Sequence, residues 1–391
     1  MWQFYVSGVE QLNVAVGASV SNELNRQNST FTVECNRVDS ILHFEECKIT
    51  QDGEAIAAGL ITSQNFKESG IKRASITATD YYYVFQRRIV VERFENMRAS
   101  DILKALISKY AYEFSTAAID DTLTEIELFE CEYILLSEAI TQLMSYLSDW
   151  YYYIDADKVF HLFESYETDG VRFEKNAAGK YNFKKDTLSV TYDADNVVSR
   201  VWVIGAEQAA SSAVTQLFTC DGQNRYFTLA YEPNYTEIYL DDELQESLLE
   251  ENDDEAQDFL INKDNRVVFI PSYVETPYTG TLKVVYNPTV QVIEYFEDSN
   301  GDSPYLLEKV VKNKDITDKM TARAYGRAEI KRVRSITRSI SFQTSEKAAI
   351  GQRCYVNISD YNIDGFYLVK RVQAKCMTEG KVINTVSLEE I

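Results

Sequence analysis

The most informative pattern of apolar and polar positions lies in Leu188–Gly205. Apolar and polar residues alternate over Leu188–Tyr192, which is the period of a β-strand. Asp193–Asn196 is a polar break of the kind that turns or bulges a chain. Val197–Ile204 is apolar on both faces, which is typical of a strand that is covered on both sides. All five prolines fall between this stretch and Pro304. We therefore expect a β-domain that the chain leaves to make an inserted module and then completes.

Residues 1–95 have the pattern of an all-β domain. Asp52-Gly53 supplies the turn of a hairpin. Gly59, in the strand that follows, indicates a bulge or a close approach of another backbone. Short strands at such spacing predict a small barrel or sandwich. The strand-like runs are Trp2–Val6, Phe31–Cys35, Leu42–Ile49, Ala55–Ile61, Ala74–Thr79 and Tyr81–Val91.

Residues 96–185 predict a small α/β domain. Ser100 is expected to cap a first helix, with Asp101 in its first turn, where the helix dipole favours an acid. Apolar residues follow at helical spacing up to Tyr110. A second helix is expected to start at Ser137, with Glu138 at its first position and helical spacing through Leu147. Two strands, Trp150–Ile154 and Val159–Phe163, complete the unit.

Residues 206–303 form the proline-bearing interval and predict a β-rich module. Asp241–Asp258 is dense in acidic residues and contains no lysine or arginine. Such a run is typical of a solvated face. A calcium loop is the alternative, although the D-x-D-x-D-G spacing is missing. We expect the module to project from the rest of the protein, because an excursion is tolerated when its two ends lie close together.

The segment after Pro304 predicts a helix and then strands. Asp315 or Thr317 is expected to cap a helix that runs to about Val333. Four basic residues share one face of it, either exposed to solvent or paired with acidic surface on a neighbouring subunit: Arg323, Arg327, Lys331 and Arg334. The chain then ends in strands. The sequence thus predicts four parts. They are an N-terminal β-domain (1–95), an α/β domain (96–185), a discontinuous second β-domain (186–205 with 304–391) and the inserted module (206–303).

Composition excludes several classes of protein. A chain of 391 residues corresponds to two to four domains, and a net charge of −22 argues against a nucleic-acid-binding surface. The six cysteines show no CxxC and only two histidines accompany them, so we expect free thiols and no zinc site. The N-terminus lacks the features of a signal peptide, and no apolar run is long enough to span a membrane.

Catalytic motifs are missing as well. The sequence has no GxSxG, P-loop, HExxH or GxGxxG motif, so we predict no catalytic, cofactor-binding or metal-binding residues. Carboxylates are abundant, but the sequence cannot select the pair that a glycosidase needs. His161 lies between Phe160 and Leu162 in a predicted strand, which favours a packed core histidine over a ligand or base.

The ordered series of segments resembles the tail hub family of tailed bacteriophages, which includes late control protein D and baseplate or tail-tip hub proteins. The matching segments are Asp52–Ile61, Asp80–Arg88, Ser100–Tyr110, Ser137–Asp157, Asn196–Gly205, Ile350–Gln352 and Gly365–Val372. The inserted module is similar to β-rich insertions of long-tailed phage hubs, at Asp221–Leu229 and Gly280–Tyr286.

The resemblance implies a mainly β virion protein of the tail tip or baseplate, and the missing catalytic motifs predict no cofactor and no enzymatic activity. Members form homotrimers in which two tube-like β-barrel domains per chain make a pseudo-sixfold ring. That ring joins the sixfold tail tube to the threefold tip and its spike or fibre proteins. Genomic DNA passes through the channel without specific binding, so we expect a neutral to acidic wall. Two alternatives remain: a carbohydrate-binding receptor module, which a glycan screen would reveal, and a carboxylate-based glycosidase.

Overall fold

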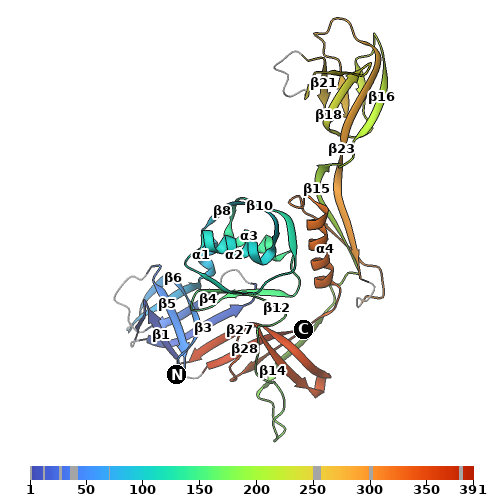
Figure 1. Cartoon of the computed structure of the whole chain (residues 1–391). Helices are drawn as coiled ribbons and strands as arrows, with labels where there is room; N and C mark the ends of the chain where they lie inside the picture. Colours follow the sequence, from blue (N-terminus) through green and yellow to red (C-terminus); the bar gives the residue numbers. More distant parts are fainter. Residues whose placement is uncertain are drawn as a thin grey trace. The chain divides into compact units, whose positions relative to one another are not determined.

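The computed structural model describes residues 2–11, 14–25, 29–35, 43–69, 71–249, 257–298, 303–377 and 382–391. The chain divides into two compact units. Unit 1 comprises Met1–Trp202, Tyr295–Lys309 and Arg323–Ile391, and unit 2 comprises Val203–Glu294 and Val310–Ala322. Both are built mainly of β-strands, as the sequence predicts (Figure 1).

The first part of unit 1 is all-β. Asp52 and Gly53 have φ values of 54° and 87° and make the predicted turn between two paired strands. Two positive φ angles in succession are what a two-residue hairpin turn requires. Phe4, Phe31 and Ile49 belong to the buried core of this part. The strands are β1 (Trp2–Val6), β2 (Val9–Glu10), β3 (Val14–Glu23), β4 (Thr30–Cys35), β5 (Glu46–Gln51), β6 (Glu54–Ser69) and β7 (Ile71–Asp80).

The α/β part of unit 1 has both predicted helices. Its elements are α1 (Tyr82–Phe85), β8 (Ile89–Arg98), α2 (Ala99–Tyr110), β9 (Ser115–Ile119), β10 (Glu125–Leu135), α3 (Leu136–Met144), β11 (Trp150–Ile154) and β12 (Val159–Glu164). The predicted cap at Ser100 is wrong. Helix α2 begins one residue earlier, and the Ser100 N–H donates to Thr122 Oγ1 over 3.0 Å. Helix α3 begins at Leu136, and Glu138 caps it by accepting from the Leu135 N–H over 3.0 Å.

The last part of unit 1 is again β. It consists of β13 (Thr168–Asp169), β14 (Phe183–Asp193), β25 (Thr337–Thr344), β26 (Gln352–Ile358), the 3-10 turn η2 (Ser359–Tyr361), β27 (Ile363–Met377) and β28 (Val382–Glu390). A second core lies here, with Phe173, Phe342 and Val356 fully buried.

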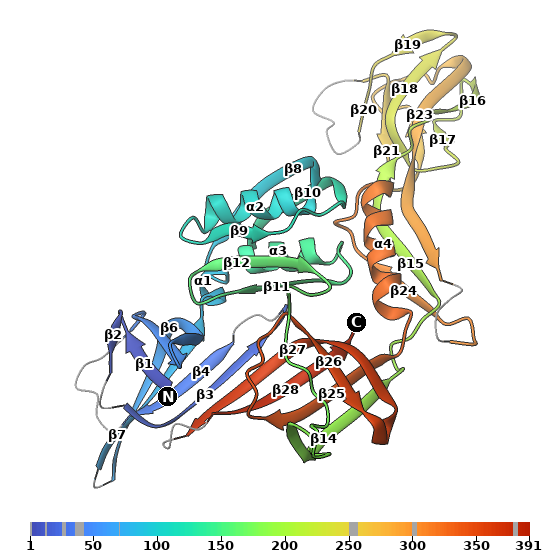
Figure 2. The ribbon, with the colours of Figure 1, turned by 60° about the horizontal axis from the view of Figure 1, so that its bottom comes forward.

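One continuous sheet joins the two β-parts of unit 1. Its strand order is β14-β25-β28-β27-β3-β4-β7-β6-β5-β1-β2, with β26 and β13 attached beside β27. Strand β27, in red, therefore lies beside the blue β3 (Figure 2). Among the described strands this sheet is open, so the two predicted tube-like parts are not separate closed barrels.

Unit 2 contains its own sheets. Its strands, including two that continue into unit 1, are β15 (Arg200–Ala209), β16 (Val214–Asp221), β17 (Tyr226–Thr228), β18 (Pro233–Leu240), β19 (Glu243–Gln245), β20 (Ser247–Leu249), β21 (Phe259–Asn262), β22 (Val267–Phe269) and β23 (Thr279–Glu297). No described strand between β15 and β24 (Glu308–Lys312) takes part in the large sheet of unit 1.

The predicted place of Val197–Ile204 in the second β-domain is wrong. Strand β15 pairs with β23 and β24 rather than continuing the sheet that contains β14. The burial of Val201 and Val203 fits a strand with a covered face. At the next position on that face, Gly205 lies against Val292 of β23 and the Ile316 carbonyl. Periodicity identified the strand and could not identify its partner.

The predicted helix after Pro304 is α4 (Lys319–Val333). Its cap is Asp318, which accepts from the Thr321 N–H over 2.7 Å, rather than Asp315 or Thr317. Gly326 packs so closely against the ring of Phe296 that an added Cβ would lie 2.1 Å from it. The helix is therefore held against the end of β23.

Candidate functional site

Strand β27 is the element that the rest of unit 1 is built around. It pairs with β3 from Arg371–Glu23 to Met377–Gly17, in antiparallel register. Val369 and Val372 of β27 lie in the C-terminal core, whereas Ala374 and Cys376 lie in the N-terminal core. One strand thus contributes side chains to two hydrophobic cores and connects them.

The pairing of β3 with β27 is called the seam below. Hydrogen bonds at the end of β3 connect the α/β part to this seam. Leu24 donates its N–H to the Lys370 carbonyl over 2.9 Å. The side chain of Asn25 pairs with the edge of β11: its Oδ1 accepts from the Tyr152 N–H over 2.8 Å, and its Nδ2 donates to the Trp150 carbonyl. These bonds satisfy backbone groups that would otherwise be unpaired at a strand edge. All three parts of unit 1 meet here.

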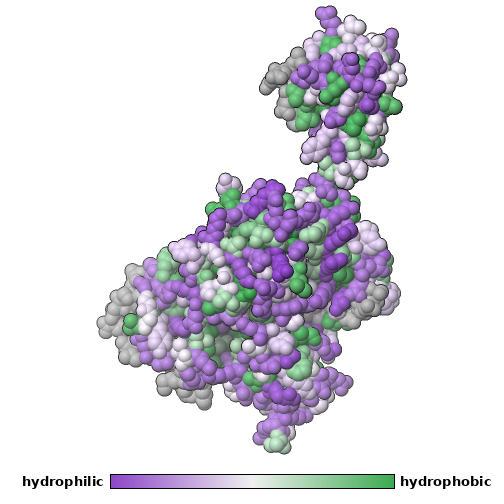
Figure 3. Space-filling model, viewed as in Figure 1, coloured by the Kyte–Doolittle hydropathy of each residue, from purple (hydrophilic) through white to green (hydrophobic). Residues whose placement is uncertain are grey.

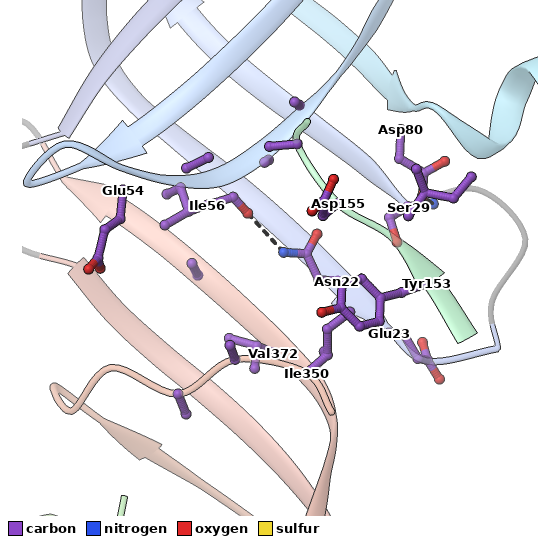
Figure 4. A pocket seen from close by; sticks show the side chains of 18 of the residues that line it. Asn22, Glu23, Ser29, Glu54, Ile56, Asp80, Tyr153, Asp155, Ile350 and Val372 are labelled. Carbon is purple, nitrogen blue, oxygen red and sulfur yellow. Dashed lines mark hydrogen bonds between the residues drawn. The ribbon is translucent and has the colours of Figure 1, made fainter. Parts of the chain in front are cut away.

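A pocket of about 330 Å³ lies on the face of the seam. Asn22 of β3 and Val372 of β27 contribute to it, together with the hairpin residues Glu54 and Ile56 and the end of β11 (Figure 4). Asn22 Nδ2 donates to the Ile56 carbonyl over 2.8 Å. The pocket therefore occupies the junction between the N-terminal β-part, the α/β part and the loop around Ile350.

The charged groups of this pocket are engaged within the protein. Glu54 forms an ion pair with Lys347 over 2.9 Å. The carboxylate of Asp80 accepts from the Ser29 N–H over 2.7 Å and the Tyr82 N–H over 3.1 Å. Such pairing is typical of a structural junction, since a binding site usually presents polar groups that await a ligand. We interpret the pocket as part of the framework.

His161 is more than the packed core histidine that the sequence favoured. Its Nδ1 lies 2.6 Å from Glu167 Oε1 and its Nε2 lies 3.1 Å from Asp155 Oδ2. Its ring stacks on Tyr153 at 4.4 Å, and the Tyr153 hydroxyl donates to Glu167 over 2.6 Å. Glu167 also donates its N–H to the Gly351 carbonyl, so the cluster ties the segment after β12 to the C-terminal β-part. Spacing alone could not reveal this, because Glu167 lies beyond the strand.

The His161 cluster predicts a pH-dependent contribution to stability. Burial lowers the pKa of His161, but the hydrogen bonds and charges of Glu167 and Asp155 outweigh it and raise the pKa above its ordinary value. A raised folded pKa means that the contribution is complete below about pH 6.5 and is lost as pH rises through the folded value. The variant His161→Gln should therefore be less stable than the wild type by roughly 1–2 kcal/mol at pH 6, and the gap should narrow by pH 9.

Urea unfolding of both proteins across that pH range would measure this gap. The chain's other histidine, His43, is exposed and provides the matched control His43→Gln, which should leave the pH dependence unchanged. A gap for His161→Gln that is constant with pH, or that widens toward pH 9, would contradict the assigned ion pairs.

Two of the four residues on the predicted basic face, Lys331 and Arg334, form ion pairs within the chain. Lys331 contacts Asp149 over 2.7 Å, and Arg334 contacts Asp298 over 2.8 Å. Arg332 donates to the Leu147 carbonyl over 3.0 Å and also pairs with Glu329. The alternative of pairing with a neighbouring subunit is therefore not needed for Lys331 or Arg334.

The remaining sequence predictions concern cysteines, metals and membranes. All six cysteines are free and buried, and burial raises the pKa of the Cys35, Cys354 and Cys376 thiols to about 11. In the described part of the chain, no three His, Cys, Asp or Glu side chains are grouped to hold a metal ion. Part of the acidic run Asp241–Asp258, the candidate calcium loop, lies outside the described residues. None of the helices in the described ranges has the length and apolar character of a membrane span.

Comparison with known proteins identifies the fold. No protein-family model and no curated protein matches the sequence. A tail protein from Neisseria meningitidis MC58 is similar in structure, with a TM-score of 0.60, 13% identity and coverage of 100% of this chain and 96% of that chain. The 43 kDa tail protein of prophage MuSo2 from Shewanella oneidensis has a TM-score of 0.61 and 9% identity, and the match covers 99% of this chain and 97% of that chain. Prophage tail protein gp18 from Listeria monocytogenes EGD-e has a TM-score of 0.54 and 10% identity, and the match covers 97% of this chain and 90% of that chain.

The chain therefore has the fold of phage tail proteins. The similarity extends over nearly the whole length of this chain and of each of these three structures. The resemblance that the ordered segments indicated is confirmed at the level of the fold.

Proposed function

We propose that this chain is a structural hub protein of a phage tail tip or baseplate, located in the virion. In this proposal three copies form a pseudo-sixfold ring that joins the tail tube to the tip and surrounds the DNA channel. Its partners are further copies of itself, tail-tube or distal tail proteins, and spike or fibre proteins.

The observation that carries the proposal is the continuous sheet across β3 and β27. A ring with six similar β-segments can be built from three chains only if each chain supplies two segments in a fixed relation. The seam fixes that relation, because β27 lies in both cores. Cyclic closure is also the common solution for an assembly of identical chains.

The open ends of the sheet support the same proposal. Strand β14 has a described partner on one side only, β25, and the opposite end of the sheet is the short β2. Unpaired strand edges are places where another chain can add. In a closed ring, neighbouring copies would cover both ends.

The first test is the mass of the purified protein. We expect a trimer, three times the 44.8 kDa chain mass, by light scattering at micromolar concentration. Electron microscopy of negatively stained particles should show rings with threefold symmetry. A monomer in solution together with the absence of a ring in assembled tails would refute the proposal.

We also propose that the chain has no peptidoglycan-hydrolysing activity. The similar solved structures are described as tail proteins, and the sequence lacks the nucleophile and histidine sets of hydrolases. A host cell-wall zymogram should therefore show no cleared band at the mass of this chain, with lysozyme as the positive control. A cleared band that disappears when one carboxylate is changed would establish the glycosidase alternative instead.

A further inference from the structure

His161 contacts two carboxylates, one at each nitrogen of its ring. Nδ1 lies 2.6 Å from Glu167 Oε1, and Nε2 lies 3.1 Å from Asp155 Oδ2. Only the charged imidazolium form carries a hydrogen on both nitrogens. A neutral imidazole keeps one N–H, so the lone pair of its other nitrogen must face a carboxylate. Both hydrogen bonds can therefore exist only while His161 holds its second proton.

The contact with Asp155 is the one expected to be lost with that proton. The Glu167 contact is shorter, and the Tyr153 hydroxyl also donates to Glu167 over 2.6 Å, which holds that carboxylate in place. The single hydrogen of a neutral His161 is therefore expected at Nδ1. Nε2 then presents a lone pair to Asp155 Oδ2, and two acceptors at this distance repel each other.

The carboxylate of Asp155 organises the turn between β11 and β12. Its Oδ1 accepts from the Asp157 N–H over 2.9 Å and from the Val159 N–H over 2.8 Å. The turn in this position also forms an ion pair with β5 of the N-terminal β-part, between Asp157 and Lys48 over 3.3 Å. Displacement of the Asp155 carboxylate would thus loosen the turn and its connection to β5.

Among the described groups that face the ring, His161 is the one that titrates between pH 6 and pH 9. The others are Asp155, Glu167 and the stacked Tyr153 of β11. Burial raises the pKa of Glu167, but hydrogen bonds from His161 and Tyr153 outweigh it and lower the pKa. Burial raises the pKa of Tyr153 above its ordinary value. Burial lowers the pKa of His161, but the two carboxylates outweigh it and raise the pKa, so the proton leaves only above about pH 6.5.

We propose that His161 is a proton-dependent switch of the β11–β12 turn, which Asp155 holds in place while His161 is charged and releases when the proton leaves. Glu167 connects the same ring to the C-terminal β-part, since its N–H donates to the Gly351 carbonyl over 2.9 Å. One proton thus acts where the α/β part contacts both β-parts of unit 1. Asp157 is exposed and the visible surface is mainly hydrophilic (Figure 3), so water can solvate the released turn. The switch lies within one chain and does not depend on the proposed ring.

Hydrogen–deuterium exchange of the full-length chain at pH 6 and pH 9 tests the switch, with each rate divided by the intrinsic rate at that pH. The turn, residues 154–160, should lose protection roughly ten-fold at pH 9, the effect of one hydrogen bond to a charged group. Helix α2 should remain far more protected than the turn at both pH values, because the opening is local. In His161→Gln, which has no proton to lose, the turn should be equally and weakly protected at both.

The variant Asp155→Asn should behave in the opposite way. Its Nδ2 can donate to the neutral His161 nitrogen while its Oδ1 still accepts from the two backbone amides, so the turn should stay protected at pH 9. The turn that starts at Asp221 is the matched control, because the Asp221 carboxylate also accepts from two backbone N–H groups and this turn contains no histidine. Its protection should not change with pH.

Two results would overturn the proposal. The first is a wild-type turn that is equally protected at pH 6 and pH 9, or one that is as protected as α2. The second is an Asp155→Asn turn that opens at pH 9 as far as the wild-type turn does, since another group would then control the opening.

Discussion

Replacing Gly59 with alanine is expected to destabilise the protein by about 3 kcal/mol or more, since overpacking against a fixed backbone is among the severe point changes. A Cβ at this position would lie 2.0 Å from the Thr79 carbonyl oxygen and 2.8 Å from the Asp80 Cα. The obstacle is the backbone of the paired strand β7, which cannot turn aside as a flexible side chain can. Either β6 and β7 must separate or Asp80 must move.

Movement of Asp80 would spread the damage. Its carboxylate holds the Ser29 and Tyr82 N–H groups, which lie at the start of β4 and of α1. Urea unfolding should therefore show a much lower midpoint for Gly59→Ala. The matched control is Gly365→Ala on β27, where the nearest atom is 4.0 Å from the added Cβ. Equal midpoints for the two variants would show that the close approach at Gly59 is not present in solution.

Local elements of this fold could be predicted because nearby residues determine them. The turn at Asp52-Gly53 needs two positive φ angles, and an Asp-Gly pair adopts them at low cost. The buried face of α2, with Ile102, Leu103 and Leu106, follows from helical spacing. The capping error at Ser100 arose because the partner of a first-turn N–H can come from a distant segment, as Thr122 does. The error at Asp315 is one of helix start, since the nearby Asp318 is the cap.

Long-range pairing could not be predicted in the same way. Strand β3 pairs with β27, more than 300 positions away, and neither strand's pattern of apolar residues specifies that neighbour. The joint at Asn25 likewise depends on a single amide that meets the edge of β11. The His161 cluster was missed for a different reason: Asp155 and Glu167 are each only six positions away, but they lie outside β12, where strand spacing gives no information.

The distribution of charge along the sequence changes the interpretation of the net charge of −22. Residues 206–303 contain 20 acidic and 4 basic residues, for a net charge of −16. The rest of the chain contains 41 acidic and 35 basic residues, for a net charge of −6. The acidic character that suggested a phosphate-repelling channel therefore belongs mostly to the inserted segment. A neutral wall, rather than a strongly acidic one, is the better expectation for a channel built from the large sheet. Either kind of wall avoids the salt-dependent affinity that would slow DNA.

The inserted module can be defined more narrowly than residues 206–303. Its core consists of Cys220, Phe227, Leu229, Ile238, Phe259, Ile261, Val268, Ile270, Leu282, Val284 and Tyr286, all between positions 211 and 287. Ala210 donates its N–H to the Pro288 carbonyl over 2.8 Å, and Asn287 Nδ2 donates to the Ala210 carbonyl over 2.6 Å. The two ends of this self-contained part are thus hydrogen-bonded neighbours.

Replacing residues 211–287 with Asn-Gly should therefore leave a folded trimer. An Asn-Gly turn closes two antiparallel strands, which here would be the remaining parts of β15 and β23. The wider replacement of 206–303 is expected to destabilise the chain. It removes Ala206 and Val292 from beside Ile316, which is fully buried, and exposing such a side chain costs about 1.5–3 kcal/mol. Thermal unfolding and light scattering of both variants would measure this contrast. If the narrow excision unfolds the chain or abolishes the trimer, the segment is not an independent module.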